Sequence, residues 1–101
     1  MRLTSLLPFV AVTALSLSPS AQAATTITWW HAMEGVLGEK VNAIAEEFNA
    51  SQNDYVVKPV YKGSYSDNLT ATIAAFRAGQ APAITQVFEV GTATMMNAKG
   101  A

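Results

Sequence analysis

One carboxylate, Glu89, lies near the end of an otherwise uncharged stretch, APAITQVFEVGT, at residues 81–92. A carboxylate taken out of water is costly unless a cation or hydrogen-bond donors meet it. Those donors could be a Lys or Arg of the protein, or the hydroxyl groups of a polyol or sugar. Glu89 is therefore the first candidate ligand-binding residue, and an internal ion pair is the alternative.

Tyr65 is the second candidate ligand-binding residue. It follows Gly63 in the sequence KGSY, where a turn is predicted, so its hydroxyl group can reach a crevice. Trp29, Trp30 and Tyr61 lie near the ends of predicted strands, where aromatic side chains more often belong to the core.

The pair His31 and Glu34 has the spacing HxxE, which could supply two metal ligands from one helix face. A single His without a second ligand pair is a weak signal, and we expect His31 to hydrogen-bond locally. The sequence contains none of the motifs GxSxG, GxGxxG and GxxxxGK[ST]. We predict no catalytic residue, no metal site and no cofactor; a hydrolase would need Glu34 to act with Glu89.

Hydrophobic periodicity predicts three strands that alternate with three helices. The strands are expected at 26–30, 55–61 and 83–90, and the helices at 37–48, 69–76 and 91–98. This order favours an α/β fold with a mostly parallel sheet and right-handed crossovers.

Local signals refine this prediction. Pro59 indicates an edge strand or a bulge, and Gly79 is expected at positive φ where the second helix ends. The near-continuous apolar run at 83–90 predicts a strand covered on both faces. Ligands of open α/β sheets bind outside the carboxyl ends of the strands, which places Tyr65 and Glu89 at the expected site.

Residues 1–23 have the pattern of a secretory signal peptide. Arg2 precedes an apolar stretch at 6–17, and Ala21-Gln22-Ala23 is a small-x-small cleavage site. The prediction is a periplasmic protein whose folded part begins at residue 24. The absence of Cys excludes a disulfide framework and a lipid anchor on Cys.

Charge excludes one class of partner. The chain has 6 Lys and Arg against 7 Asp and Glu, so no basic field exists to attract nucleic acid. We therefore predict no nucleic-acid partner.

Three stretches carry a resemblance to a known family: WWHAMEG, EEFNASQNDY and VYKGSYSDNLTATIAAFRAGQAPAITQVFEVGTATMM, at 29–35, 46–55 and 60–96. They resemble the N-terminal part of the extracytoplasmic solute-binding proteins of ABC importers, the class that includes maltose-binding protein. Within this class they are most similar to members that bind sn-glycerol-3-phosphate. The resemblance implies that residues 24–101 are the start of lobe 1 of a two-lobed periplasmic-binding-protein fold, truncated before the hinge and the second lobe.

The resemblance also implies roles for the two candidate residues. The family's ligand-contacting tyrosine in YKGxY matches Tyr65, and its glutamate in the motif QV-aromatic-EVGT matches Glu89. The implied function is capture of sn-glycerol-3-phosphate by a monomer in the periplasm, for uptake through ABC permease subunits in the inner membrane. Because a carboxylate repels phosphate, Glu89 is expected to accept hydrogen bonds from the glycerol hydroxyls.

The phosphate group is expected to find most of its donors outside this chain. Within the chain, Ser64 and the N–H groups near Gly91 are the candidates. Whether glycerophosphodiesters also bind is left open. The alternatives are a binding protein for another sugar or polyol, a secreted hydrolase, and a non-functional truncated remnant.

Overall fold

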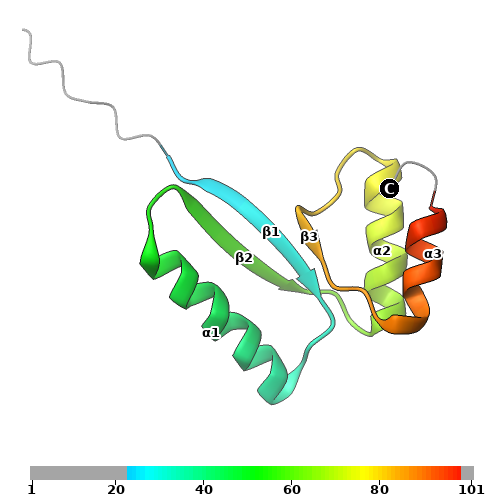
Figure 1. Ribbon diagram of the computed structural model, residues 1–101, viewed down its shortest axis with the longest axis horizontal. Coiled ribbons are helices and arrows are strands. Elements are labelled where there is room, and N and C mark those ends of the chain that lie inside the picture. The colour runs from blue at the N-terminus through cyan, green and yellow to red at the C-terminus, as the bar shows by residue number, and fades with distance from the viewer. Residues whose placement is uncertain (1–22, 99–101) are drawn as a thin grey trace, which may run out of the picture.

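The computed structural model describes residues 23–98 and forms an α/β unit (Figure 1). Its elements, in chain order, are β1 (Thr25–His31), α1 (Gly35–Ser51), β2 (Tyr55–Tyr61), α2 (Tyr65–Arg77), β3 (Ile84–Thr85), the 3-10 turn η1 (Glu89–Gly91) and α3 (Thr92–Asn97). Residues 1–22 of the predicted signal peptide lie outside the described residues. Among residues 23–98, none of the helices has the length and hydropathy that a bilayer span requires.

The three strands form one parallel sheet in the order β2-β1-β3. β1 pairs with β2 along its whole length, from Thr25 opposite Tyr55 to His31 opposite Tyr61. On its other side, β1 pairs with β3 through Trp29 and Trp30 alone. The predicted parallel α/β fold is confirmed, and Pro59 lies in β2 at the edge of this sheet, as predicted.

The helices cover opposite faces of the sheet, as Figure 1 shows for α1 on one side and α2 with α3 on the other. Alternation along β3 decides which residue meets which helix, because successive side chains of a strand point to opposite faces. Ile84 borders the apolar groove against α1. The next residue, Thr85, hydrogen-bonds to Asn68 and Thr72 of α2.

The apolar core of the described residues is small. Val41 and Ala45, both in α1, are the buried hydrophobic side chains. Beside them lies an open groove of about 390 Å³ between α1 and the sheet. Ile44 and Phe48 line this groove and remain 59% and 41% exposed. We call it the α1 groove; its lining residues are Ile27, Trp29, Ile44, Ala45, Phe48, Val57 and Ile84.

Helix α2 is fixed at both ends by the residues that its sequence offers. Ser64 Oγ accepts a hydrogen bond from the Asp67 N–H at 3.1 Å, and Asp67 Oδ2 accepts one from the Ser64 N–H at 3.0 Å. This reciprocal capping box satisfies two N–H groups that the first turn would otherwise leave free. At the other end Gly79 has φ +71°, as the sequence predicts.

The predicted third strand at 83–90 is wrong in its length and burial. Pairing stops at Thr85, and Glu89–Gly91 forms the 3-10 turn η1. The reason lies at Gln86, whose carbonyl accepts a hydrogen bond from the side chain of Asn68 at 2.8 Å. A backbone group satisfied by a side chain has less need of a neighbouring strand. Val90, expected to be buried, is 72% exposed.

Asn68 is the most deeply buried polar residue described, with 0% exposure. Its Nδ2 donates to the Gln86 carbonyl and lies 3.3 Å from Thr85 Oγ1, while Thr72 Oγ1 lies 2.8 Å from the same hydroxyl. Two residues one helical turn apart on α2 thus hold the end of β3 and the chain beyond it. This attachment is polar, in contrast to the apolar contact of α1 with the other face.

We predict that Asn68→Ala lowers the free energy of unfolding by about 1–3 kcal/mol, because the part-buried Gln86 carbonyl loses its side-chain donor. Urea unfolding of the chain followed by circular dichroism measures this change. Thr70→Ala is the matched control, since Thr70 is exposed on the same helix and should change stability by less than about 0.5 kcal/mol. Equal losses in the two variants would contradict the assigned role of Asn68.

Candidate functional site

The carboxyl ends of the strands meet at one edge of the sheet, where hydrogen bonds join the segments that follow them. The Lys62 N–H donates to the His31 carbonyl at 2.9 Å, and the Gln86 N–H donates to the Trp30 carbonyl at 2.9 Å. Gln86 Oε1 accepts from the Ala32 N–H at 3.0 Å. The loop after each strand is therefore anchored to β1, as expected of a site at this edge.

Tyr65 is the first residue of α2, directly after the cap residue Ser64. The turn before it has little freedom, since Gly63 has φ +98° and a Cβ there would meet Asp67 Oδ2 at 2.7 Å. The Tyr65 ring is stacked on the ring of Phe88, with 5.2 Å between centroids and an interplanar angle of 17°. It remains 43% exposed, so the ring has both a fixed face and a free face.

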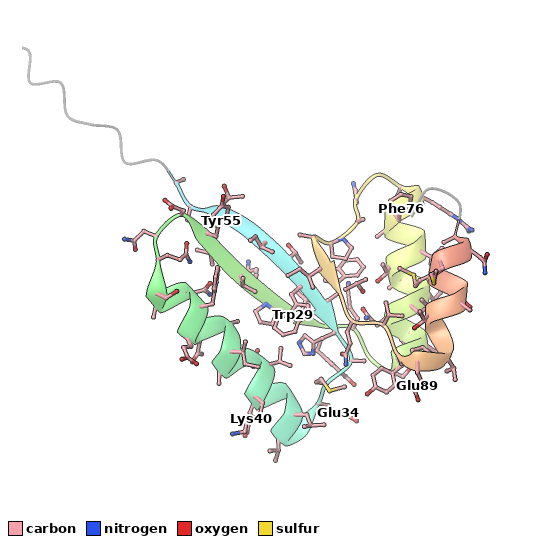
Figure 2. All side chains as sticks on the ribbon, in the orientation of Figure 1. Trp29, Glu34, Lys40, Tyr55, Phe76 and Glu89 are labelled. Carbon is pink, nitrogen blue, oxygen red and sulfur yellow. The ribbon has the colours of Figure 1, made fainter. Side chains whose placement is uncertain are left out.

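Glu89 opens the turn η1 and is exposed. The sequence prediction that it ends a buried strand is therefore wrong, and water replaces the donors that burial would demand. Figure 2 shows Glu89 beside the beginning of α2, at the end of that helix opposite to Phe76. Because Phe88 precedes Glu89 and stacks on Tyr65, the two predicted ligand-binding residues lie in the same region of the surface.

Glu34 and Tyr61 belong to a different part of the edge. Tyr61 Oη donates to Glu34 Oε2 at 3.1 Å, and this hydrogen bond to a carboxylate raises the pKa of Tyr61. Both residues line an open hollow of about 430 Å³ between β2 and the start of α1. Figure 2 shows Glu34 below the end of β1 and Glu89 beside the beginning of α2, so the two carboxylates of the hydrolase alternative lie on different segments.

His31 is the last residue of β1 and is 4% exposed. Its Nδ1 accepts a hydrogen bond from the Met33 N–H at 3.2 Å, so the predicted local hydrogen bond is confirmed. Burial lowers the pKa of His31. Among residues 23–98, no three His, Cys, Asp or Glu side chains are grouped to hold a metal ion.

Three residues make contacts at this edge that the sequence did not predict. The Nζ of Lys62 lies 3.8 Å from the centroid of the Trp30 ring, a cation–π contact that keeps a positive charge near the ends of β1 and β2. Gln86 ties the chain after β3 to the loop after β1, and Phe88 stacks on Tyr65. The position of Lys62 beside Gly63, directly after a strand, is a local signal that it lies at this edge. No local signal in the sequence indicates the contacts of Gln86 and Phe88.

Comparison with known proteins adds a second line of observation. No family model matches the chain. The sn-glycerol-3-phosphate-binding periplasmic protein UgpB of Escherichia coli (strain K12) is 60% identical over 85 residues. This chain is homologous to that protein. The proteins of the same name from Escherichia coli O1:K1 / APEC and Shigella dysenteriae serotype 1 (strain Sd197) show the same identity over the same number of residues.

The homology confirms the resemblance inferred from the three sequence stretches. The aligned residues are 84% of this chain but 19% of each of these three relatives. The chain therefore spans less than one fifth of the length of the curated relatives it matches. The comparison carries no residue assignments of its own.

We predict that the chain loses stability as the pH falls from about 7 to about 5. The unfolded His31 protonates near its usual pKa of about 6.5, whereas the folded residue, whose pKa is lowered, resists protonation. The unfolded state thus binds more protons in this window, and the free energy of unfolding rises with pH. Urea unfolding at a series of pH values measures the slope.

The matched variant is His31→Asn, which keeps an acceptor for the Met33 N–H but does not titrate in this range. Because His31 is the sole His of the chain, the variant should lose most of the slope between pH 5 and 7. A slope of the same size in the variant would assign the effect to other groups.

Proposed function

We propose that this chain supplies part of the binding site of a periplasmic protein that captures sn-glycerol-3-phosphate and delivers it to an ABC permease in the inner membrane. The observation that carries this proposal is the 60% identity, over 84% of the chain, to proteins named for binding that ligand. The proposed protein is a monomer, requires no cofactor and catalyses no reaction. Its signal peptide is the segment at residues 1–23.

Glu89 is proposed to bind the glycerol end of the ligand. An ionised carboxylate accepts hydrogen bonds and repels phosphate, so vicinal hydroxyl groups are its natural partners. Its exposure in this chain supports the assignment, since the carboxylate is free to exchange water for ligand hydroxyls. A ligand enclosed in a closed cleft would leave any unmatched hydroxyl unsatisfied, at about 1–3 kcal/mol each, and this penalty gives specificity.

Tyr65 is proposed to bind through the face and hydroxyl group that Phe88 leaves free. The phenol can donate a hydrogen bond to a ligand oxygen while the ring packs along the carbon chain. The phosphate group is proposed to find its main donors outside this chain, with Ser64 and the N–H groups near Gly91 as the contributions from within it. The Ser64 N–H already donates to Asp67 Oδ2 and the Gly91 N–H to the Phe88 carbonyl, so both are weaker candidates than the donors proposed outside this chain.

The test is a chimera in which residues 24–98 of this chain replace the aligned segment of the Escherichia coli K12 relative. Isothermal titration with sn-glycerol-3-phosphate measures its Kd. We predict that the chimera binds the ligand and that Glu89→Gln weakens binding at least tenfold, or ~1.4 kcal/mol, because a neutral amide accepts hydrogen bonds less strongly. Tyr65→Phe should also weaken binding, because it removes the hydroxyl group proposed to donate a hydrogen bond to the ligand and leaves the ring in place.

Two matched controls carry the same chemical changes at exposed positions distant from the proposed site. Glu47→Gln on α1 and Tyr55→Phe at the start of β2 should leave the Kd unchanged. A chimera that folds but does not bind sn-glycerol-3-phosphate would contradict the proposed ligand. Binding that Glu89→Gln leaves intact would remove Glu89 from the site.

A further inference from the structure

Phe88 connects the two proposed ligand-binding residues. It precedes Glu89 in the sequence, and its ring stacks on the ring of Tyr65 at 5.2 Å, although the two aromatic residues are far apart in the chain. The opposite face of Tyr65 has no aromatic partner among the described residues, and the side chain is 43% exposed. Phe88 is therefore the aromatic contact of the Tyr65 ring among the described residues.

Gly91 provides the space in which the Phe88 ring lies. A Cβ on Gly91 would be 2.7 Å from Phe88 Cε1, closer than real Cβ atoms approach, and 3.0 Å from Phe88 Cδ1, which is tighter than most real Cβ contacts. The same Cβ would lie 3.4 Å from Leu69 Cδ2, so α2 limits movement away from the ring. Gly91 is buried and has φ −85°, which any residue can adopt. The requirement for glycine here is spatial and does not come from the backbone conformation.

The turn η1 also fixes the backbone of Phe88 relative to Glu89. The Gly91 N–H donates to the Phe88 carbonyl at 2.9 Å, and Thr92 Oγ1 donates to the same oxygen at 3.2 Å. A shift of the Phe88 ring would therefore be passed to Tyr65 on one side and to the turn that carries Glu89 on the other.

We propose that Phe88 is a positioning residue for ligand binding, held by Gly91 so that the Tyr65 ring presents its free face next to Glu89. This inference rests on the proposed binding of sn-glycerol-3-phosphate by Tyr65 and Glu89. It adds two residues, Phe88 and Gly91, that do not touch the ligand. They affect the affinity through the Tyr65 ring, which does touch it.

The binding test is a double-mutant cycle in the chimera described above, with sn-glycerol-3-phosphate as the titrant. Gly91→Ala should weaken binding at least about fivefold, because the added methyl group displaces the Phe88 ring and with it Tyr65. In a Tyr65→Ala background the same substitution should change the Kd by less than about twofold. Thr94→Ala, an exposed change on α3, should leave the Kd unchanged.

An equal loss of affinity from Gly91→Ala in both backgrounds would overturn the inference, because the effect would then not pass through Tyr65. No loss in either background would overturn it as well. Thermal unfolding of each variant shows whether the variant is folded at the temperature at which its Kd is measured. A purely structural role of Gly91 would lower the melting temperature without the dependence on Tyr65.

A second readout, proton NMR of the full chain, does not depend on ligand binding. The stacked Phe88 ring should shift the ring protons of Tyr65 upfield, and Tyr65→Phe identifies their signals. Gly91→Ala and Phe88→Leu should each reduce this shift. If the chimera fails to bind but the shifts behave as stated, the proposed function fails and the positioning of Tyr65 stands. Unshifted Tyr65 protons in the unmodified chain would overturn the positioning itself.

Discussion

The hydrogen bond from the Asn68 side chain to the Gln86 carbonyl determines the arrangement of the region that carries both proposed ligand-binding residues. It joins the buried side of α2 to the chain just beyond β3 and leaves that chain free to turn away from the sheet. The turn then brings Phe88 against Tyr65 at the beginning of the same helix. The buried side-chain amide of Asn68 thus holds α2, which follows β2, against the loop that follows β3.

This arrangement separates the two kinds of polar chemistry at the carboxyl edge. On the side of α1, Glu34 is already engaged by Tyr61, and His31 is buried with its Nδ1 occupied. On the side of α2, Glu89 is exposed and Tyr65 has a free face. Polar groups satisfied within the protein contribute to structure, whereas exposed groups on a restrained backbone are available to a ligand. The structure thus gives a physical reason to favour Glu89 over Glu34, although both are carboxylates near strand ends.

Much of the fold was predictable because its signals are local. β-Branched and aromatic composition indicated the first strand, hydrophobic periodicity indicated the first two helices, and Gly79 indicated where α2 ends. The stretch at 83–90 was predicted wrongly, because an apolar run does not distinguish a strand covered on both faces from a loop in which only some side chains pack. Phe88 packs on Tyr65, while Val90 faces solvent, and neither fact is encoded in the run itself.

The candidate site also has residues that the sequence predicted and residues that it did not. Tyr65 and Glu89 were found from their types, their places after strands and a family resemblance, but the argument from burial of Glu89 was wrong. The positioning roles proposed for Phe88 and Gly91 could not be predicted, because they depend on contacts between residues that are distant in the sequence. A glycine whose φ is ordinary gives no sign in the sequence that a ring occupies the space of its missing side chain.

The α1 groove has a thermodynamic consequence for the chain. Since Val41 and Ala45 are the hydrophobic side chains described as buried, unfolding brings less new apolar surface into water than it would from a larger core. Both the heat-capacity change and the denaturant dependence of unfolding scale with that surface. Residues 23–98 should therefore unfold over a broad range of temperature and urea concentration, with a stability curve that is unusually flat. Any partner that fills the groove would sharpen the transition, so the steepness of unfolding reports whether the groove is covered.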